Sequence, residues 1–501
     1  MKLAKLLAWL VAFGTACLAQ TALGDDVGTR NCGESVTAEI LTILRDAGNI
    51  NEGQFEALCR KARGEETPRA KTVAASEPSK PTWDFAWKDS FRLERSDGAY
   101  KLRFGGRLHL DGALIFPDSD LESDLAEAAP TGVGTRGNGV EFRRARFFFE
   151  GTVYERIFFK AQYDFAQPED DDDPDFKDLF VGVKLGPVKD LRVGHFKEPM
   201  MLQEWTSSKY IVFMERGLNN VFFPGRNVGL MAAGDAVDKR LFWQTGIFRN
   251  TNDQGFGFND WDDTEWNLAA RLVGAPVYSD DGSQVIHLGA SYIHEFLGAQ
   301  GFFGATDEDG KIIGGNLRYR QRPSTHLARR FVDTQNSFSE TRNILASDTD
   351  ILNIEAAGVF GPLSVQTEYT NSWVKGAGAQ DDLHFWGIYA QTSWFLTGEH
   401  RVYDLGNGRF RRLKPKQNFN PGKGGWGAWE IAARYSYLDL TDENIRGGKL
   451  WDVTAALNWY LYPNFRWMLN YVHGHVGDRV SGDQEIRGGA DVFETRFAFD
   501  F

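Results

Sequence analysis

The stretch Tyr100–Phe116, YKLRFGGRLHLDGALIF, decides the fold of this 501-residue chain. Its even-numbered positions carry apolar side chains or glycine, and its odd-numbered positions are polar or small, apart from Ile115. A period of two is typical of a β-strand with one apolar face. Strands of soluble proteins usually have about five or six residues. The 17 residues found here suit a tilted strand that crosses a bilayer and projects beyond it.

The same alternation recurs in at least four further segments. They are Ile157–Phe165, Leu179–Leu185, Leu363–Thr370 and Phe493–Phe501. A composition of 54 Gly, 38 Phe, 15 Trp and 15 Tyr suits a chain of many strands joined by turns. A large soluble all-β sandwich or propeller is the competing fold, but blade repeats of roughly 40–50 residues are not visible.

The connections between these segments alternate in length, as in outer-membrane barrels, where periplasmic turns are short and outer loops are long. The tight connections are at 154–155, 186–187, 361–362 and 462–464, and the long ones are 117–138, 166–176, 198–225 and 298–348. One long segment, 398–425, falls on the expected periplasmic side. We therefore predict an all-β fold, a transmembrane antiparallel β-barrel of about sixteen strands that covers residues 95–501. Whether Arg318–Arg322 forms a strand of its own stays open.

The N-terminus has the three parts of a secretory signal peptide over residues 1–24. Lys2 and Lys5 form a positive region, Leu6–Phe13 is apolar, and Ala22-Leu23-Gly24 supplies small residues at the cleavage site. Its removal takes away two lysines and changes the net charge from −13 to −15. An acidic exported chain argues against nucleic acid as a partner.

Residues 25–63 are predicted to form a small periplasmic helical hairpin, and residues 64–94 a linker that is rich in proline. Asn51 can cap the second helix together with Gln54. The hairpin could contact peptidoglycan or aid trimer formation, or it could be a spacer. Export permits a disulfide between Cys32 and Cys59, and two free thiols are the alternative.

Arginines of the predicted wall mark its water-filled side. In GVEFRRARFFFEG (Gly139–Gly151), Arg144 and Arg146 share one face, opposite Phe147 and Phe149. Arg143 has the other parity, so either a bulge re-aims one arginine or Arg143 lies at a subunit contact or beyond the lipid.

Arg103 and Arg107 likewise share one face of the preceding strand. Arginine stays charged and pairs bidentately with phosphate, so a ladder of such groups could pass an anion from site to site.

Several segments resemble the phosphate-selective porin O and P family, in the family's order and over about residues 95–501. They are GGRLHLD (105–111), FRRAR (142–146), LRVGHFKEPMMLQEWTSSKYIVFMER (191–216), FLTGE (395–399), GAWEIAARYS (427–436) and NWYLYPNFRWMLNYV (458–472). The resemblance implies a trimeric anion porin of the bacterial outer membrane with sixteen strands and with loops folded into the pore.

The resemblance also assigns individual residues. Arg107, Arg143 and Arg144 match pore arginines of the family, Lys209 in TSSK matches a lysine of the constriction loop, and Arg216 in MER matches a further basic position. A basic run on the fifth outer loop corresponds, with shifted spacing, to Arg318, Arg320 and Arg322.

We therefore expect a passive, anion-preferring diffusion channel for phosphate or polyphosphate. The alternatives are a general, non-selective porin and a structural barrel tethered to the cell wall. The expected surroundings are outer-membrane lipid and lipopolysaccharide, and the expected assembly is a homotrimer. The sequence has no motif for a Ser-His or Asp-His catalytic site, so no enzymatic activity is expected. No metal or cofactor is expected either, since His473 and His475 have no third ligand nearby in the sequence.

Overall fold

The computed structural model describes residues 40–62 apart from 42 and 46, and residues 81–128, 138–166, 175–251, 265–297, 305–306, 312–335, 344–481 and 484–501. The chain divides into two compact units, Met1–Lys80 and Pro81–Phe501. None of the helices in these described ranges has the length and apolar character needed to cross a membrane.

In the first unit, residues 40–41 and 43–45 are helical and helix α3 spans Glu52–Ala62. The backbone N–H of Asn51 donates to the side chain of Gln54, and the backbone N–H of Gln54 donates to the side chain of Asn51, both at 3.0 Å. This reciprocal pair starts α3 by satisfying two backbone donors. The predicted signal peptide 1–24, Cys32 and the first part of the linker lie outside the described residues.

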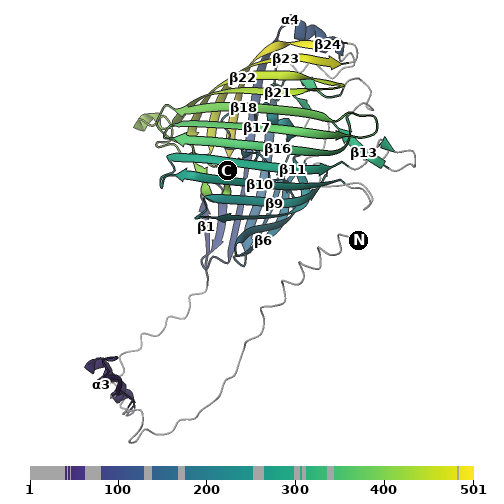
Figure 1. The fold of residues 1–501 in the computed structure, drawn as a ribbon. Coiled ribbons are helices and arrows are strands. Elements are labelled where there is room, and N and C mark those ends of the chain that lie inside the picture. Colours follow the sequence, from purple (N-terminus) through teal and green to yellow (C-terminus); the bar gives the residue numbers. More distant parts are fainter. Residues whose placement is uncertain are drawn as a thin grey trace. The chain divides into compact units, whose positions relative to one another are not determined.

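In the second unit, sixteen strands among the described residues pair in antiparallel order, and the last strand pairs with the first to close a barrel (Figure 1). The barrel strands are β3 (Tyr100–Pro117), β4 (Gly139–Val153), β5 (Ile157–Asp164), β6 (Asp175–Leu185), β7 (Val188–Lys197), β8 (Arg226–Ala236), β9 (Leu241–Arg249), β10 (Trp266–Tyr278), β11 (Gln284–Phe296), β16 (Ile344–Phe360), β17 (Leu363–Gly376), β18 (Leu383–Phe395), β21 (Ala428–Asp442), β22 (Ile445–Tyr462), β23 (Phe465–Ser481) and β24 (Gln484–Asp500). The predicted fold class and strand number are confirmed.

The two faces of β3 point as predicted, with the apolar side chains outward and the polar ones into the lumen. Phe104, Leu114 and Phe116 on its outer face are 44%, 51% and 52% exposed, whereas Arg107 and His109 on its inner face are 7% and 1% exposed. Outward-facing apolar side chains with polar ones inside are the arrangement of a barrel in lipid.

The predicted linker 64–94 contains a hairpin that belongs to the sheet. Strands β1 (Trp83–Trp87) and β2 (Phe91–Arg95) pair with each other, and β2 continues the sheet along the first residues of β3. The predicted boundary at residue 95 therefore lies inside β2. Five-residue strands are too short for alternation to reveal, which is why the sequence did not predict them.

The eight connections singled out from the sequence have the expected lengths, but the alternation ends after β21, because the last three connections between barrel strands have two residues each. Several connections carry small elements of their own. These are α4 (Ser119–Ala128), α5 (Leu202–Trp205), η1 (Leu218–Phe222), β12 (Ala305–Thr306), β13 (Ile312–Leu317), β14 (Arg320–Gln321), β15 (Val332–Asp333), β19 (Tyr403–Asp404), η3 (Leu405–Asn407), β20 (Arg409–Phe410) and η4 (Pro421–Lys423). Of the strands that the structure describes, β15 is the one that pairs with β14, and β14 takes no part in the wall, which answers the question left open for Arg318–Arg322.

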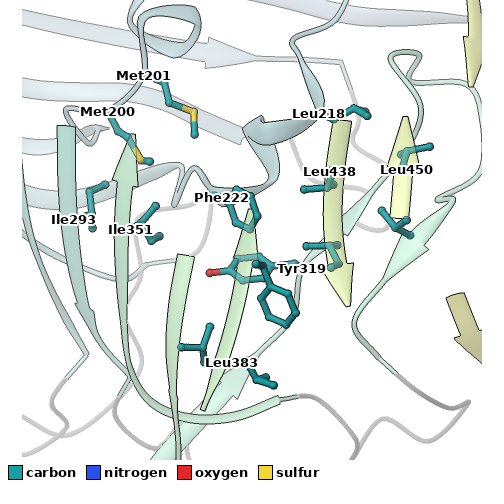
Figure 2. Packing of buried hydrophobic residues seen from close by; sticks show 14 of the residues in the cluster. Met200, Met201, Leu218, Phe222, Ile293, Tyr319, Ile351, Leu383, Leu438 and Leu450 are labelled. Carbon is teal, nitrogen blue, oxygen red and sulfur yellow. The ribbon is translucent and has the colours of Figure 1, made fainter. Parts of the chain in front are cut away.

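We name two of the long connections L3 (residues 198–225) and L5 (residues 297–343). L3 and the described residues 312–335 of L5 fold into the barrel. Their apolar side chains pack against inward-facing apolar side chains of the wall. Figure 2 shows Met200, Met201, Leu218 and Phe222 of L3 and Tyr319 of L5 beside Ile293, Ile351, Leu383, Leu438 and Leu450 of the wall. This apolar cluster fills part of the lumen and fixes the loops by burying apolar area.

The segment 396–427 lies between β18 and β21, at the end of the barrel that also carries the 361–362 turn. It too contacts lumen residues, because Tyr403 Oη lies 2.6 Å from Nδ1 of the buried His287. The backbone N–H of Phe410 donates to Thr206 Oγ1 of L3 at 3.3 Å. The lumen is therefore narrowed from both ends.

Candidate functional site

The side of the lumen that the apolar cluster leaves open is a basic cavity of about 600 Å³. Among the described residues, thirteen Arg and Lys side chains line it, and they are Arg107, Arg143, Arg144, Arg146, Lys160, Lys177, Lys189, Arg192, Lys197, Arg216, Arg226, Arg322 and Arg409. Five carboxylates line it as well, and they are Glu150, Asp178, Asp190, Glu204 and Glu215. The local field therefore favours anions although the whole chain carries −13.

A β-bulge in β4 settles where Arg143 points. His109 of β3 pairs with Arg144, whereas the next residue, Leu110, pairs with Phe142, so Arg143 is the extra residue without a cross-strand partner. The bulge lets Arg143 and Arg144 both line the cavity, as the resemblance implied. Of the alternatives left open by the alternation, the bulge is correct.

Both of these arginines meet Glu215 of L3. Arg143 donates to the two Glu215 carboxylate oxygens at 3.0 and 3.2 Å, and Arg144 Nη1 lies 3.7 Å from Oε1. Arg496 of β24 also donates to Oε1, at 2.8 Å. Burial alone would raise the pKa of Glu215, but the guanidinium charges outweigh it and hold this pKa well below its ordinary value.

Arg107 and Arg146 lie opposite each other on β3 and β4. Arg107 Nη1 donates to Ser208 Oγ of L3 at 2.6 Å, and Arg146 Nε donates to Asp164 Oδ2 at 2.6 Å. Together with Arg143 and Arg144 they form a row of four guanidinium groups along one wall of the cavity. The structure thus brings together four of the five wall arginines that the sequence singled out.

Arg103, the fifth, is directed elsewhere. It donates to Glu150 at 2.7 Å and to Ser90 at 2.8 Å, and it does not line the cavity. Lys209 of L3 lines a separate space of about 30 Å³, where its Nζ lies 3.4 Å from Asp500 Oδ2. Burial lowers the pKa of Lys209.

Arg216 reaches the cavity from L3 and pairs with Glu204, 3.1 Å away, which Lys197 also contacts. Burial would raise the pKa of Glu204, but Arg216 and Lys197 lower it to about 2. In the basic run of L5, Arg322 lines the cavity, Arg318 pairs with Asp333 at 2.6 Å, and Arg320 is exposed.

A second basic group escaped the sequence interpretation. Asp178 of β6 accepts hydrogen bonds from Lys160 at 2.6 Å and from Arg226 at 2.9 Å, and Arg409 reaches the same cavity from segment 396–427. Lys160 lies on the polar face of an alternating strand and could have been found. Arg226 directly follows L3, a loop that the resemblance implied to fold into the pore. Arg409 carries no such signal, because its position depends on how segment 396–427 folds.

Other lumen arginines hold L3 in place instead of lining the cavity. Arg466 donates to the carbonyl of Ile211 at 2.8 Å, Arg434 donates to that of Glu215 at 2.8 Å, and Arg496 donates to that of Met214. L3 is thereby bonded to β21, β23 and β24, so its side chains face the cavity from a fixed backbone.

The root of L3 supplies a prediction about pH. Glu198 is fully buried, and Asn227 and Asn267 donate to its Oε1, both at 2.7 Å. Burial raises the pKa of Glu198 from 4.5 to about 7. Its contribution to stability is therefore complete below about pH 4.5 and is lost as the pH rises through about 7, with a slope of at most about 1.4 kcal/mol per pH unit.

We expect Glu198→Gln to flatten this part of the pH dependence. The midpoint of thermal unfolding, measured at about pH 5 and about pH 8, should differ less in Glu198→Gln than in the unmodified protein. Glu204→Gln is the matched control, because a carboxyl with its pKa lowered to about 2 does not titrate in this window. An unchanged difference in Glu198→Gln would contradict the assignment.

Comparison with known proteins agrees with this architecture. The family model described as "Phosphate-selective porin O and P" matches residues 122–501. An uncharacterized protein of Caulobacter vibrioides is 29% identical over 455 residues, covering 87% of this chain and 81% of its own. Porin O of Pseudomonas aeruginosa is 24% identical over 438 residues, covering 83% of this chain and 91% of its own.

Solved structures of outer-membrane proteins are similar at lower identity. The anion-selective porin from Comamonas acidovorans has a TM-score of 0.46 at 10% identity and covers 80% of this chain and all of its own. OmpT of Vibrio cholerae has a TM-score of 0.45 at 12% identity, over 80% and 98% of the two chains. The family match spans most of the barrel, including the arginines of β4 and all of L3 and L5. The chain therefore belongs to the phosphate-selective porin O and P family, and it is a porin of the bacterial outer membrane.

Proposed function

We propose that this porin is a passive diffusion channel that prefers small anions and binds phosphate in its basic cavity. The observation that carries the proposal is the lining of that cavity, where, within the described ranges of the chain, thirteen basic side chains face five acidic ones. Such an excess in a confined space raises the local concentration of anions and excludes cations.

The chemistry of the row Arg107, Arg143, Arg144 and Arg146 fits phosphate in particular. Each guanidinium presents a planar fork of donors that matches two phosphate oxygens. Several such groups in succession let an ion exchange its hydration shell stepwise, with each site weak enough to release it. Polyphosphate, which carries the same oxygens in a longer chain, is the second substrate of this proposal.

A general, non-selective porin is the alternative, and phosphate titration distinguishes the two. Chloride current through the purified protein in a planar bilayer should fall as phosphate is added, with half-block at or below millimolar phosphate. Reversal potentials under a KCl gradient should independently report a preference for chloride over potassium. Absence of block at millimolar phosphate would leave a general porin, and a preference for potassium would contradict the proposal.

The proposal extends to the surroundings of the barrel. We propose a homotrimer in outer-membrane lipid and lipopolysaccharide, exported by a signal peptide at residues 1–24. Ile40, Ile43 and Leu58 of the helical unit are 49%, 65% and 40% exposed, which favours a partner for that unit. Peptidoglycan or the helices of other subunits are the partners we propose for it.

A further inference from the structure

We infer that the Glu215 carboxylate is a tethered counter-anion, which competes with the permeating anion for Arg143 and Arg144 and so sets how tightly the channel holds phosphate. This inference rests on the proposed function and assigns a specificity-determining role to an acidic residue in an anion channel. The pore residues predicted from the sequence are all basic.

The Glu215 carboxylate is bound by the arginines in the way that a permeating anion would be. Arg143 meets the two carboxylate oxygens with Nε and Nη2, at 3.0 and 3.2 Å, which is the bidentate arrangement in which guanidinium also binds phosphate. Arg496 adds a third hydrogen bond at 2.8 Å. Glu215, Arg143 and Arg144 all line the basic cavity, so an anion in the cavity reaches the same donors.

The neighbouring arginines differ in how fully they are neutralised. Arg496 donates to both oxygens of Asp111, at 2.7 and 2.6 Å, so it keeps a carboxylate partner without Glu215. Across the part of the chain that the structure describes, only Glu215 places a carboxylate oxygen within 4.0 Å of Arg143 or Arg144. Glu141, which lies two positions before Arg143 on β4, is bonded to His326 at 2.9 Å instead.

Glu215 can leave the arginines without moving L3. Its backbone carbonyl accepts a hydrogen bond from Arg434 at 2.8 Å, and the preceding carbonyl, that of Met214, is bonded to Arg496. Only side-chain rotation is then needed to free the two guanidinium groups. The low pKa of Glu215 keeps the carboxylate charged, so it competes with the incoming anion at every physiological pH.

A site that binds an anion strongly releases it slowly, and competition from a carboxylate speeds this release. Two neighbouring guanidinium groups without a carboxylate would hold a phosphate tightly, and a channel needs sites that bind an ion and then release it. A returning carboxylate takes over the donors as the anion departs. Its removal should therefore raise affinity and slow transport.

Glu215→Gln tests the inference, because glutamine keeps the size of the side chain and removes its charge. We expect the phosphate concentration for half-block of the chloride current to fall about tenfold, equivalent to about 1.4 kcal/mol. The maximal phosphate current should fall as well. The matched control is Glu150→Gln, which removes a carboxylate from the same cavity whose partner, Arg103, does not line it, and a shift below about threefold is expected.

Thermal unfolding supplies a second readout. Added phosphate should raise the unfolding midpoint of Glu215→Gln more than that of the unmodified protein, because the tighter-binding state gains more stability from its ligand. If Glu215→Gln does not fold, Glu215→Asp carries the test, since a shorter carboxylate competes less well and should give an intermediate affinity.

The outcomes separate the two proposals. An unmodified channel that shows neither phosphate block nor anion preference would refute the proposed function. A blocked unmodified channel with the same half-block concentration in Glu215→Gln, or in Glu215→Asp where that variant carries the test, would overturn the inference alone. Weaker phosphate block together with larger chloride conductance would also overturn it, because that result would mean that Glu215 only positions L3.

Discussion

Replacing Arg144 with alanine should lower the preference for chloride over potassium about fivefold, which corresponds to about 1 kcal/mol of lost electrostatic stabilisation of the anion. Replacing Arg143 should lower it less. Arg143 shares two hydrogen bonds with Glu215, whereas Arg144 lies 3.7 Å from that carboxylate and keeps more of its charge for the permeating ion. Strand alternation alone leads to the same ranking, but by assuming that Arg143 faces away from the lumen, which the bulge contradicts.

Reversal potentials in planar bilayers under a KCl gradient measure this difference. Arg95→Ala is a suitable control, since Arg95 of β2 pairs with Asp97 at 2.6 Å, neither residue lines the cavity, and the ratio should change little. Equal losses for Arg143→Ala and Arg144→Ala would show that pairing with Glu215 does not reduce the contribution of Arg143.

Glu368→Ala should widen the pore, with a larger single-channel conductance and a weaker anion preference. Glu368 of β17 is fully buried, and its carboxylate accepts hydrogen bonds from the backbone N–H groups of Leu202 and Gln203, both at 2.9 Å. Truncation leaves these two buried donors of L3 without their acceptor, at a cost of about 1–3 kcal/mol each. The start of L3 should then detach from the wall.

Single-channel recordings in KCl check this expectation. Glu368→Gln is the matched control, because its amide oxygen can still accept one of the two hydrogen bonds and should keep the conductance closer to that of the unmodified channel. If the conductance of Glu368→Ala is unchanged, the apolar cluster around Leu218 and Phe222 suffices to hold L3.

The sequence predicts the wall of this barrel well, because alternation along a strand such as β3 follows from the need for one apolar and one polar face. It does not predict the bulge at Arg143, since a bulge depends on how two strands pair and not on either strand alone. The β1–β2 hairpin was missed because its strands are short. Its aromatic side chains at Trp83, Phe85 and Trp87 give no alternation with a polar face of sufficient length.

The candidate site was predictable only in part. Arg107, Arg144 and Arg146 follow from strand faces, but the partners of the basic residues come from distant segments. Glu215 meets Arg143 across 72 positions, and Arg496 meets Asp111 across 385. These tertiary contacts determine which arginines line the cavity and which bond L3. Local sequence patterns do not contain that information.

The apolar cluster inside the barrel makes the width of the pore independent of the circumference of the wall, which would determine that width in an empty cylinder. Strand number sets the circumference, but Phe222 and Tyr319, packed between loops and wall, set how much of the cross-section stays open. Contact with lipid constrains the side chains of the outer face, whereas the packing of L3 and L5 determines the width of the pore. Substitutions in L3 and L5 can therefore change permeability without altering any lipid-facing residue. The outer wall of the barrel can stay the same while the pore changes.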